Sequence, residues 1–141
     1  MTSPTKEVQV AVADLLLNAA DVVAIVADTA DGPAVFAKDQ HYGDAYPRLT
    51  IEAPQRVDQS NGVAAAADMI AKLHAWAKGA DSSLVAGELA DAAIAALGGA
   101  ATLNGWRISS RRLLASRPVG DVDPEIEHFV IEYRLTVHVT A

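Results

Sequence analysis

HFVIEYRLTVHVT, which spans His128 to Thr140, alternates between apolar and polar side chains almost without interruption. Apolar residues occupy the odd-numbered positions from Phe129 to Val139, and polar residues occupy the even-numbered positions, with Val130 as the exception. Such alternation, rich in β-branched and aromatic types, is typical of a strand with one buried face and one hydrated face. We therefore predict a sheet, although the many alanines of this chain suggest helices at first sight.

Further strands are predicted upstream of this segment. Arg48–Ala53 (RLTIEA) alternates in the same way, and Pro54 ends it because proline cannot donate to a ladder. Leu103–Ala115 is a third predicted strand, whose Trp106, Ile108 and Ser110 share one face. We also expect a brief extended segment at Ala34–Ala37, a mobile hairpin loop at Gln55–Gly62 and a loop at Ser116–Glu125.

Two or three helices are predicted between these strands. The first spans Pro4–Ala19, with Ser3 as its N-cap and proline at its first position. Asp21 is expected to cap a short second helix that runs to about Ala27, although its valines and isoleucine also fit a buried strand. Ser83 is expected to cap a third helix, which ends at Gly98-Gly99. Its predicted apolar face contains Val85, Leu89, Ala92, Ala93, Ala96 and Leu97.

Val63–Lys78 is ambiguous when it is considered alone. Its alanines favour a helix by propensity. Met69, Leu73 and three alanines nevertheless share one parity, while the longer side chains, including His74 and Trp76, share the other. A strand with one apolar face and one amphipathic face fits equally well, so the pattern leaves helix and strand open.

Composition indicates a single domain over residues 1–141 that is large enough to bury a core. Alanine accounts for 29 of the residues, so the larger apolar side chains must supply most of the hydrophobic free energy. The formal net charge of −7 argues against sequence-independent binding of nucleic acid. The chain has no cysteine, no signal-peptide pattern and no apolar run long enough for a membrane span, so we expect it to fold in the cytoplasm.

No catalytic, cofactor or metal site is predicted. The four histidines (His41, His74, His128 and His138) lack the spacing of metal ligands, and histidines on a hydrated face or an edge are the simpler interpretation. The acidic segment from Asp121 to Glu127 resembles a calcium loop, but Ile126 occupies the position that requires glycine. No nucleophile elbow, P-loop or dinucleotide motif is present.

Arginines are concentrated in one short stretch, at Arg107, Arg111, Arg112 and Arg117. One interpretation is a contact surface for an acidic partner, because arginine is favoured at protein interfaces. The alternative is a solvated strand face whose arginines pair with acidic residues of a neighbouring strand, such as Glu132. Trp76 and Trp106 are expected in the core or at a subunit interface.

Taken in order, these segments resemble the tail-completion, or tail-terminator, proteins of long-tailed phages and phage-derived gene transfer agents. The resemblance runs from about Val8 to Val139 and rests on the order and spacing of its parts. After the first helix come the Tyr46-Pro47 entry into RLTIEA, the segment LHAWAKG, the helix ending AAIAAL, the acidic Asp121–Pro124 loop and the strand HFVIEYRLTVHV. The resemblance implies that Met69–Ala77 is a strand, although this segment has less Val, Ile and Thr than is usual in the family.

The expected fold is an α+β domain with an antiparallel sheet of about four strands and helices mainly on one face. The resemblance implies a structural virion protein without enzyme activity or cofactor. It would form a ring, hexameric in expectation, that caps the head-proximal end of a tail tube. Its partners would be other copies of itself, the tail tube protein and the head-completion (stopper) protein, with DNA passing through its lumen without specific binding.

Two alternatives to this function remain open at the level of sequence. One is another neck or tube component of the same particle. The other is a small α+β enzyme or ligand-binding domain that uses His41, His74 or Trp76 in a pocket.

Overall fold

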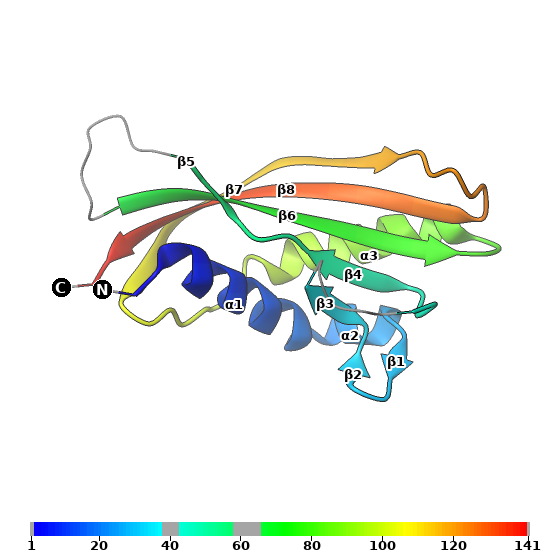
Figure 1. Ribbon diagram of the computed structural model, residues 1–141, viewed down its shortest axis with the longest axis horizontal. Coiled ribbons are helices and arrows are strands. Elements are labelled where there is room, and N and C mark those ends of the chain that lie inside the picture. The colour runs from blue at the N-terminus through cyan, green and yellow to red at the C-terminus, as the bar shows by residue number, and fades with distance from the viewer. Residues whose placement is uncertain (1, 38–42, 58–65, 141) are drawn as a thin grey trace.

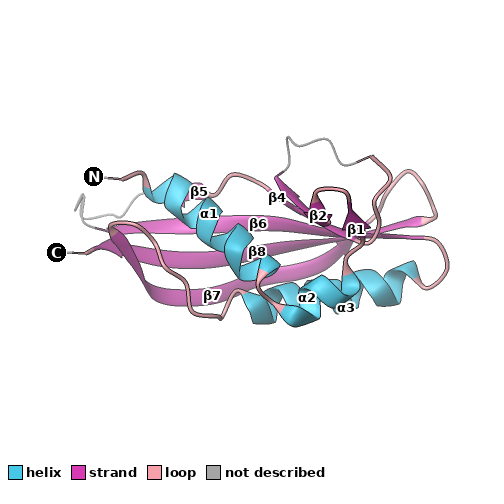
Figure 2. Ribbon diagram, turned by 90° about the horizontal axis from the view of Figure 1, so that it is seen from below, coloured by secondary structure: helices cyan, strands magenta, loops and turns pink. Residues whose placement is uncertain are grey.

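The computed structural model describes residues 2–37, 43–57 and 66–140, in which the helices lie on one side of a twisted sheet (Figures 1 and 2). Its elements, in chain order, are α1 (Pro4–Leu17), α2 (Ala20–Ile25), β1 (Asp28–Thr29), β2 (Gly32–Pro33), β3 (Val35–Ala37), β4 (Arg48–Ile51), β5 (Gln55–Val57), β6 (Ala66–Lys78), α3 (Ser82–Ala96), β7 (Trp106–Val119) and β8 (Ile126–Val139). The α+β class and the placement of the helices are as predicted.

The main sheet is larger than predicted and mixed. It has six strands in the order β3-β4-β6-β8-β7, with β5 paired to the far end of β6. β3 and β4 are parallel, whereas the other pairs are antiparallel. The prediction of about four antiparallel strands was wrong because β3 and β5 contain three residues each, which is too short for a periodic signal. β1 and β2 form a separate two-stranded ribbon.

β6 resolves the ambiguous segment as a strand. All thirteen of its residues pair with β8, from Ala66 opposite His138 to Lys78 opposite Ile126. Its odd-numbered residues face the helices and are buried, and four of these six are alanines. Pairing with a long alternating strand therefore overrides the helix propensity of the alanines.

The N-terminal helix begins as predicted. Pro4 is its first residue, and the Ser3 hydroxyl accepts a hydrogen bond from the Lys6 N–H at 3.3 Å. α1 ends at Leu17, earlier than the predicted Ala19. Its buried face, which packs against the sheet, consists of Pro4, Val8, Ala11, Val12, Leu15 and Leu16.

The other two helices differ from their predicted starts. α2 confirms the helical alternative for its segment, but Ala19 precedes it, and Asp21 lies in its first turn instead of capping it. α3 follows Asp81, whose side chain forms no capping hydrogen bond, and Ser83 lies inside the helix. The turn between β6 and α3 requires left-handed backbone, with a φ of 95° at Gly79 and 61° at Asp81.

β7 and β8 form a long antiparallel hairpin. The alternation of β8 is confirmed: Ile131, Tyr133, Leu135 and Val137 are buried beneath the helices. β7 extends to Val119, so the first part of the predicted Ser116–Glu125 loop is strand. Two irregularities shift its register, between Ile108 and Ser110 and between Leu113 and Ala115. Since β7 ends the strand order, its outer edge is not paired with another described strand.

The core lies between the helices and the sheet. Helix residues such as Val12, Leu16 and Leu89 pack against Leu49, Met69, Leu73, Ile131 and Leu135 of the central strands. Trp106 is 2% exposed and belongs to this core, and its indole N–H donates to the Thr2 carbonyl oxygen at 3.0 Å. Within the described ranges, no helix is long and apolar enough to cross a membrane.

Candidate functional site

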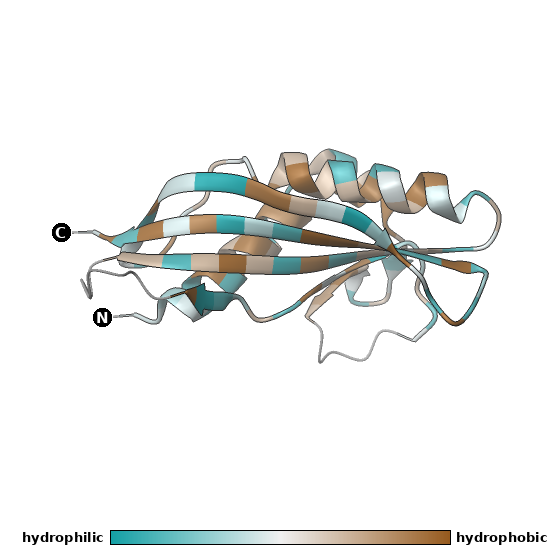
Figure 3. Ribbon diagram, turned by 90° about the horizontal axis from the view of Figure 1, so that it is seen from above, coloured by the Kyte–Doolittle hydropathy of each residue, from teal (hydrophilic) through white to brown (hydrophobic). Residues whose placement is uncertain are grey.

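The side of the sheet that faces away from the helices is uncovered by other elements among the described residues, and we call it the open face (Figure 3). It displays the even-numbered residues of β6 and β8, because directly paired residues of antiparallel strands point to the same side. Bands of hydrophilic and hydrophobic residues alternate along these strands in Figure 3. The even-numbered polar side chains of β6 and β8 therefore lie together on the open face.

A chain of three polar side chains crosses the open face from β4 toward β8. His74 Nε2 lies 2.5 Å from Glu52 Oε2, and His74 Nδ1 lies 2.6 Å from His128 Nε2. At least one of the two histidines must supply the proton that is shared between their ring nitrogens. The sequence placed these histidines far apart, and only the pairing of β6 with β8 brings them together.

Trp76 anchors one end of this chain. Its ring stacks on His128 with centroids 3.7 Å apart and an interplanar angle of 7°. The indole N–H donates to the Thr50 hydroxyl oxygen at 3.1 Å. The Arg48 guanidinium lies over the Tyr46 ring at 4.1 Å, and its carbon lies 5.5 Å from the Trp76 ring centroid. These contacts cover side chains that would otherwise be exposed on the open face.

The environment of His128 keeps its imidazole neutral near pH 7. Burial and, to a smaller extent, the nearby His74 lower the pKa of His128 from 6.5 to about 4, while Asp121 acts in the opposite direction. A general acid or base works best when its pKa lies near the operating pH. His128 is therefore poorly suited to proton transfer, and its stacked, hydrogen-bonded setting serves packing.

A second polar cluster lies toward the far end of the same strands. Arg134 forms a salt bridge with Asp68, and the Thr136 hydroxyl donates to the other Asp68 carboxylate oxygen at 2.6 Å. Arg117 of β7 lies 3.8 Å from Glu132 of β8. This last pair matches the cross-strand alternative that the sequence suggested for the arginines.

The four arginines of the β7 segment are divided between the two sides of the sheet. Arg107, Arg112 and Arg117 lie on the open face, opposite His138, Arg134 and Val130. Arg111 lies on the helical side, where its Nη1 donates to the carbonyl oxygens of Leu97 at 2.6 Å and Gly99 at 2.5 Å. The structure thus brings three of them into one row and assigns Arg111 to the C-terminal end of α3.

Charge is separated between the two sides of the sheet. Among the described residues, the open face carries seven basic side chains (Arg48, Lys72, Lys78, Arg107, Arg112, Arg117 and Arg134) against three acidic ones (Glu52, Asp68 and Glu132). The three helices carry one basic side chain (Lys6) against five acidic ones (Glu7, Asp14, Asp21, Glu88 and Asp91). The open face is therefore net positive, although the whole chain has a charge of −7.

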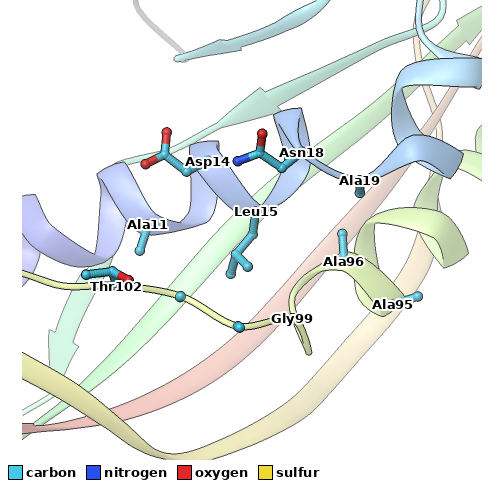
Figure 4. A pocket seen from close by; sticks show the side chains of 11 residues that line it. Ala11, Asp14, Leu15, Asn18, Ala19, Ala95, Ala96, Gly99 and Thr102 are labelled. Atoms are coloured by element: carbon cyan, nitrogen blue, oxygen red, sulfur yellow. The ribbon is translucent and has the colours of Figure 1, made fainter.

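A cavity away from the open face contains no catalytic pair. It has a volume of about 440 Å³ and lies between α1 and the segment that follows α3 (Figure 4). Its lining is mostly alanine and glycine, and Asp14 is its one ionisable side chain. His74 and Trp76 do not line it, and His41 lies outside the described residues. Within those residues, no group of three His, Asp or Glu side chains could hold a metal ion.

A model of the protein family described as Tail completion protein gp17 matches residues 10–138. A search of curated protein sequences found no match. Among solved structures, a chain described as "Virion of native gene transfer agent (GTA) particle" superposes with a TM-score of 0.81 and 19% sequence identity. The superposition covers 98% of this chain and 99% of the other, so the two share one fold over their full lengths.

Proposed function

Since the chain belongs to the family of tail completion proteins, we propose that it forms a hexameric ring that caps the head-proximal end of a tail tube. The ring would stop tube growth and join the tail to the head-completion (stopper) protein, in a phage or a gene transfer agent. Membership in this family makes the chain a structural protein of a tailed particle, and the position, ring and partners constitute the proposal.

The observation that carries the proposal is the extent of the family match. The matched residues 10–138 include α2, α3, the C-terminal part of α1 and the whole sheet except the last residue of β8. They also coincide with the span of about Val8 to Val139 over which the segments resemble tail-terminator proteins. The likeness in fold to a chain of a gene transfer agent virion supports the same assignment at the level of architecture.

The proposed mechanism is steric. Copies that associate head to tail through one repeated contact close into a ring when the rotation between neighbours permits it. A ring on the growing end of a tube occupies the surface to which the next tube subunit would bind. Its opposite surface remains free to receive the stopper protein, and an overall negative charge limits retention of DNA in the lumen.

The direct test is to mix the purified protein with preformed tail tubes and image the tube ends by electron microscopy. We expect density at one end only, and tubes polymerised in its presence should be shorter than tubes polymerised alone. Tubes mixed with heat-unfolded protein provide the control. Binding along the tube wall, or no binding, would refute the proposal, and binding only after the stopper is added would favour another neck component.

A further inference from the structure

We propose that neighbouring copies in the ring meet through two named surfaces, which deepens the proposed function and depends on it. The first, the arginine row, consists of Arg107, Arg112 and Arg117 on the open face of β7. The second, the acidic stripe, consists of Leu84, Glu88, Asp91 and Ala95 on α3. The arginine row of one copy would dock on the acidic stripe of the next.

The arginine row is exposed and incompletely paired. Arg107 and Arg112 form no ion pair with another described residue, whereas Arg117 forms the 3.8 Å pair with Glu132. Leu114, which lies at the second register shift of β7 between Arg112 and Arg117, is 41% exposed. Arginine combined with exposed apolar side chains is the composition that protein interfaces favour.

The acidic stripe has the complementary composition. Its residues recur at helical spacing on the side of α3 that faces away from the sheet, and all of them are exposed. Leu84 is 71% exposed, and neither Glu88 nor Asp91 pairs with a cation among the described residues. The stripe therefore combines an exposed leucine with two unpaired carboxylates. The arginine row combines an exposed leucine with unpaired guanidinium groups, so the two surfaces are complementary in charge and alike in apolar content.

The two surfaces lie on opposite sides of the sheet, so they cannot meet within one chain. α3 packs against β6 and β8 on the helical side, whereas the arginine row is on the open face. A contact between two different patches of identical copies is heterologous, and such contacts generate rings when they close. The acidic stripe of a second copy can therefore reach the arginine row, whereas the stripe of the same copy cannot.

DNA is the competing occupant because it is also acidic. Two features favour a second copy. The formal charge of −7 repels a polyanion at long range, and phosphate binding does not explain why Leu114 beside the row and Leu84 on α3 are exposed. Retention of DNA by the arginine row is therefore an outcome that the experiments must detect.

Cysteine cross-linking tests the contact directly, because the chain has no cysteine of its own. Ser110 is exposed, lies on the open face opposite Thr136, and falls between Arg107 and Arg112. We expect a mixture of S110C and L84C proteins to form a disulfide-linked heterodimer on mild oxidation. A mixture of S110C with V122C, whose site is fully exposed in the β7–β8 turn, is the matched control. The yield of the S110C–L84C heterodimer should exceed that of the S110C–V122C heterodimer by roughly fivefold or more, as expected for a preferred contact.

Charge reversal tests the same contact without a covalent bond. Both R107E/R112E and E88K/D91K should weaken self-association, measured by sedimentation, by about tenfold or more. Mixing the two variants should restore association, because each then offers the charge that the other has lost. K6E/R56E changes the net charge as R107E/R112E does, at exposed sites outside the row, and should associate like the unaltered protein.

Several results would overturn the inference. S110C homodimers in preference to heterodimers would indicate a symmetric contact, and heterodimer yields equal to the control would indicate no contact. Loss of double-stranded DNA binding by R107E/R112E, with self-association unchanged, would assign the row to DNA. Tube-end capping without cross-linking would refute this contact alone, whereas cross-linking without tube-end capping would refute the proposed function alone.

Discussion

His128 shows how the sheet changes the chemistry of a single side chain. The sequence places it on the hydrated face of a strand, yet it is buried between Trp76 and His74. Val130, the exception in the alternating pattern, is buried on the same face, where His74 and Arg117 are its cross-strand neighbours. Part of the open face thus forms a small second packed layer, in which His128 is held neutral.

This environment predicts a loss of stability in mild acid. The unfolded chain binds a proton at His128 near pH 6.5, whereas the folded chain binds it near pH 4, so stability falls as pH decreases between these values. Between about pH 7 and about pH 5 we expect the free energy of unfolding to fall by about 2 kcal/mol more than in H128Q. Urea denaturation of both proteins at each pH measures the difference, and parallel pH profiles would contradict it.

At the scale of elements, the irregularities of β7 determine which side of the sheet its side chains face. With strict alternation, Ser110 would share a face with Trp106 and Ile108. The register shift after Ile108 instead places Ser110 on the open face and directs Arg111 to the end of α3. α3 has no basic residue in its last turn, so Arg111 provides the positive charge that favours its C-terminal carbonyl groups.

We therefore expect R111A to destabilise the protein by about 1.5–3 kcal/mol, because two charge-assisted hydrogen bonds are lost near the end of a helix. R112A is the matched control and should change stability by no more than about 0.5 kcal/mol, as for an ordinary exposed residue. Urea titration of the two variants gives the comparison. Equal losses would show that Arg111 has no special structural role.

The sequence predicted elements with strong periodicity and failed where periodicity was weak. β8 and the start of α1 have clear alternation and a clear cap, and both were predicted well. The predicted apolar face of α3 was half right: Leu89, Ala93 and Leu97 are buried, but Val85, Ala92 and Ala96 are only partly buried. The structure also buries Ala86 and Ala90, which were not predicted. An alanine-rich helix has little contrast between its sides, so the sequence could not fix its rotation against the sheet.

The surface sites were partly predictable for a related reason. The concentration of arginines was visible in the sequence, but their division between two faces depends on the irregularities of β7. The pairing of His74 with His128 depends on the register of β6 and β8, which no local pattern specified. A sequence argument that first paired these two strands through their apolar faces would have found it.

At the scale of the whole molecule, encounter between copies depends more on how charge is separated between the two sides of the sheet than on the net charge. A basic open face and acidic helices give each copy two sides of opposite sign, which favours head-to-tail encounter and disfavours contact between like faces. The same core joins the helices to the sheet, so these two sides are held in a fixed relation.

Salt should therefore weaken association while leaving the fold largely unaffected. Raising the salt concentration from about 0.05 M to about 0.5 M shortens the screening length to roughly 4 Å. We expect the dissociation constant for self-association to rise by about tenfold, with the free energy of unfolding changed by less than about 1 kcal/mol. Sedimentation and urea titration at both concentrations measure these quantities. Association that strengthens with salt would indicate a mainly apolar contact.

The outer edge of β7 is not paired with another described strand. A long strand with a free edge can recruit the same strand of another molecule and start a fibre. β7 counters this with two register shifts, with Pro118, which has no N–H to donate, and with like-charged arginines that repel one another. These features of β7 therefore disfavour association of two molecules through their sheet edges.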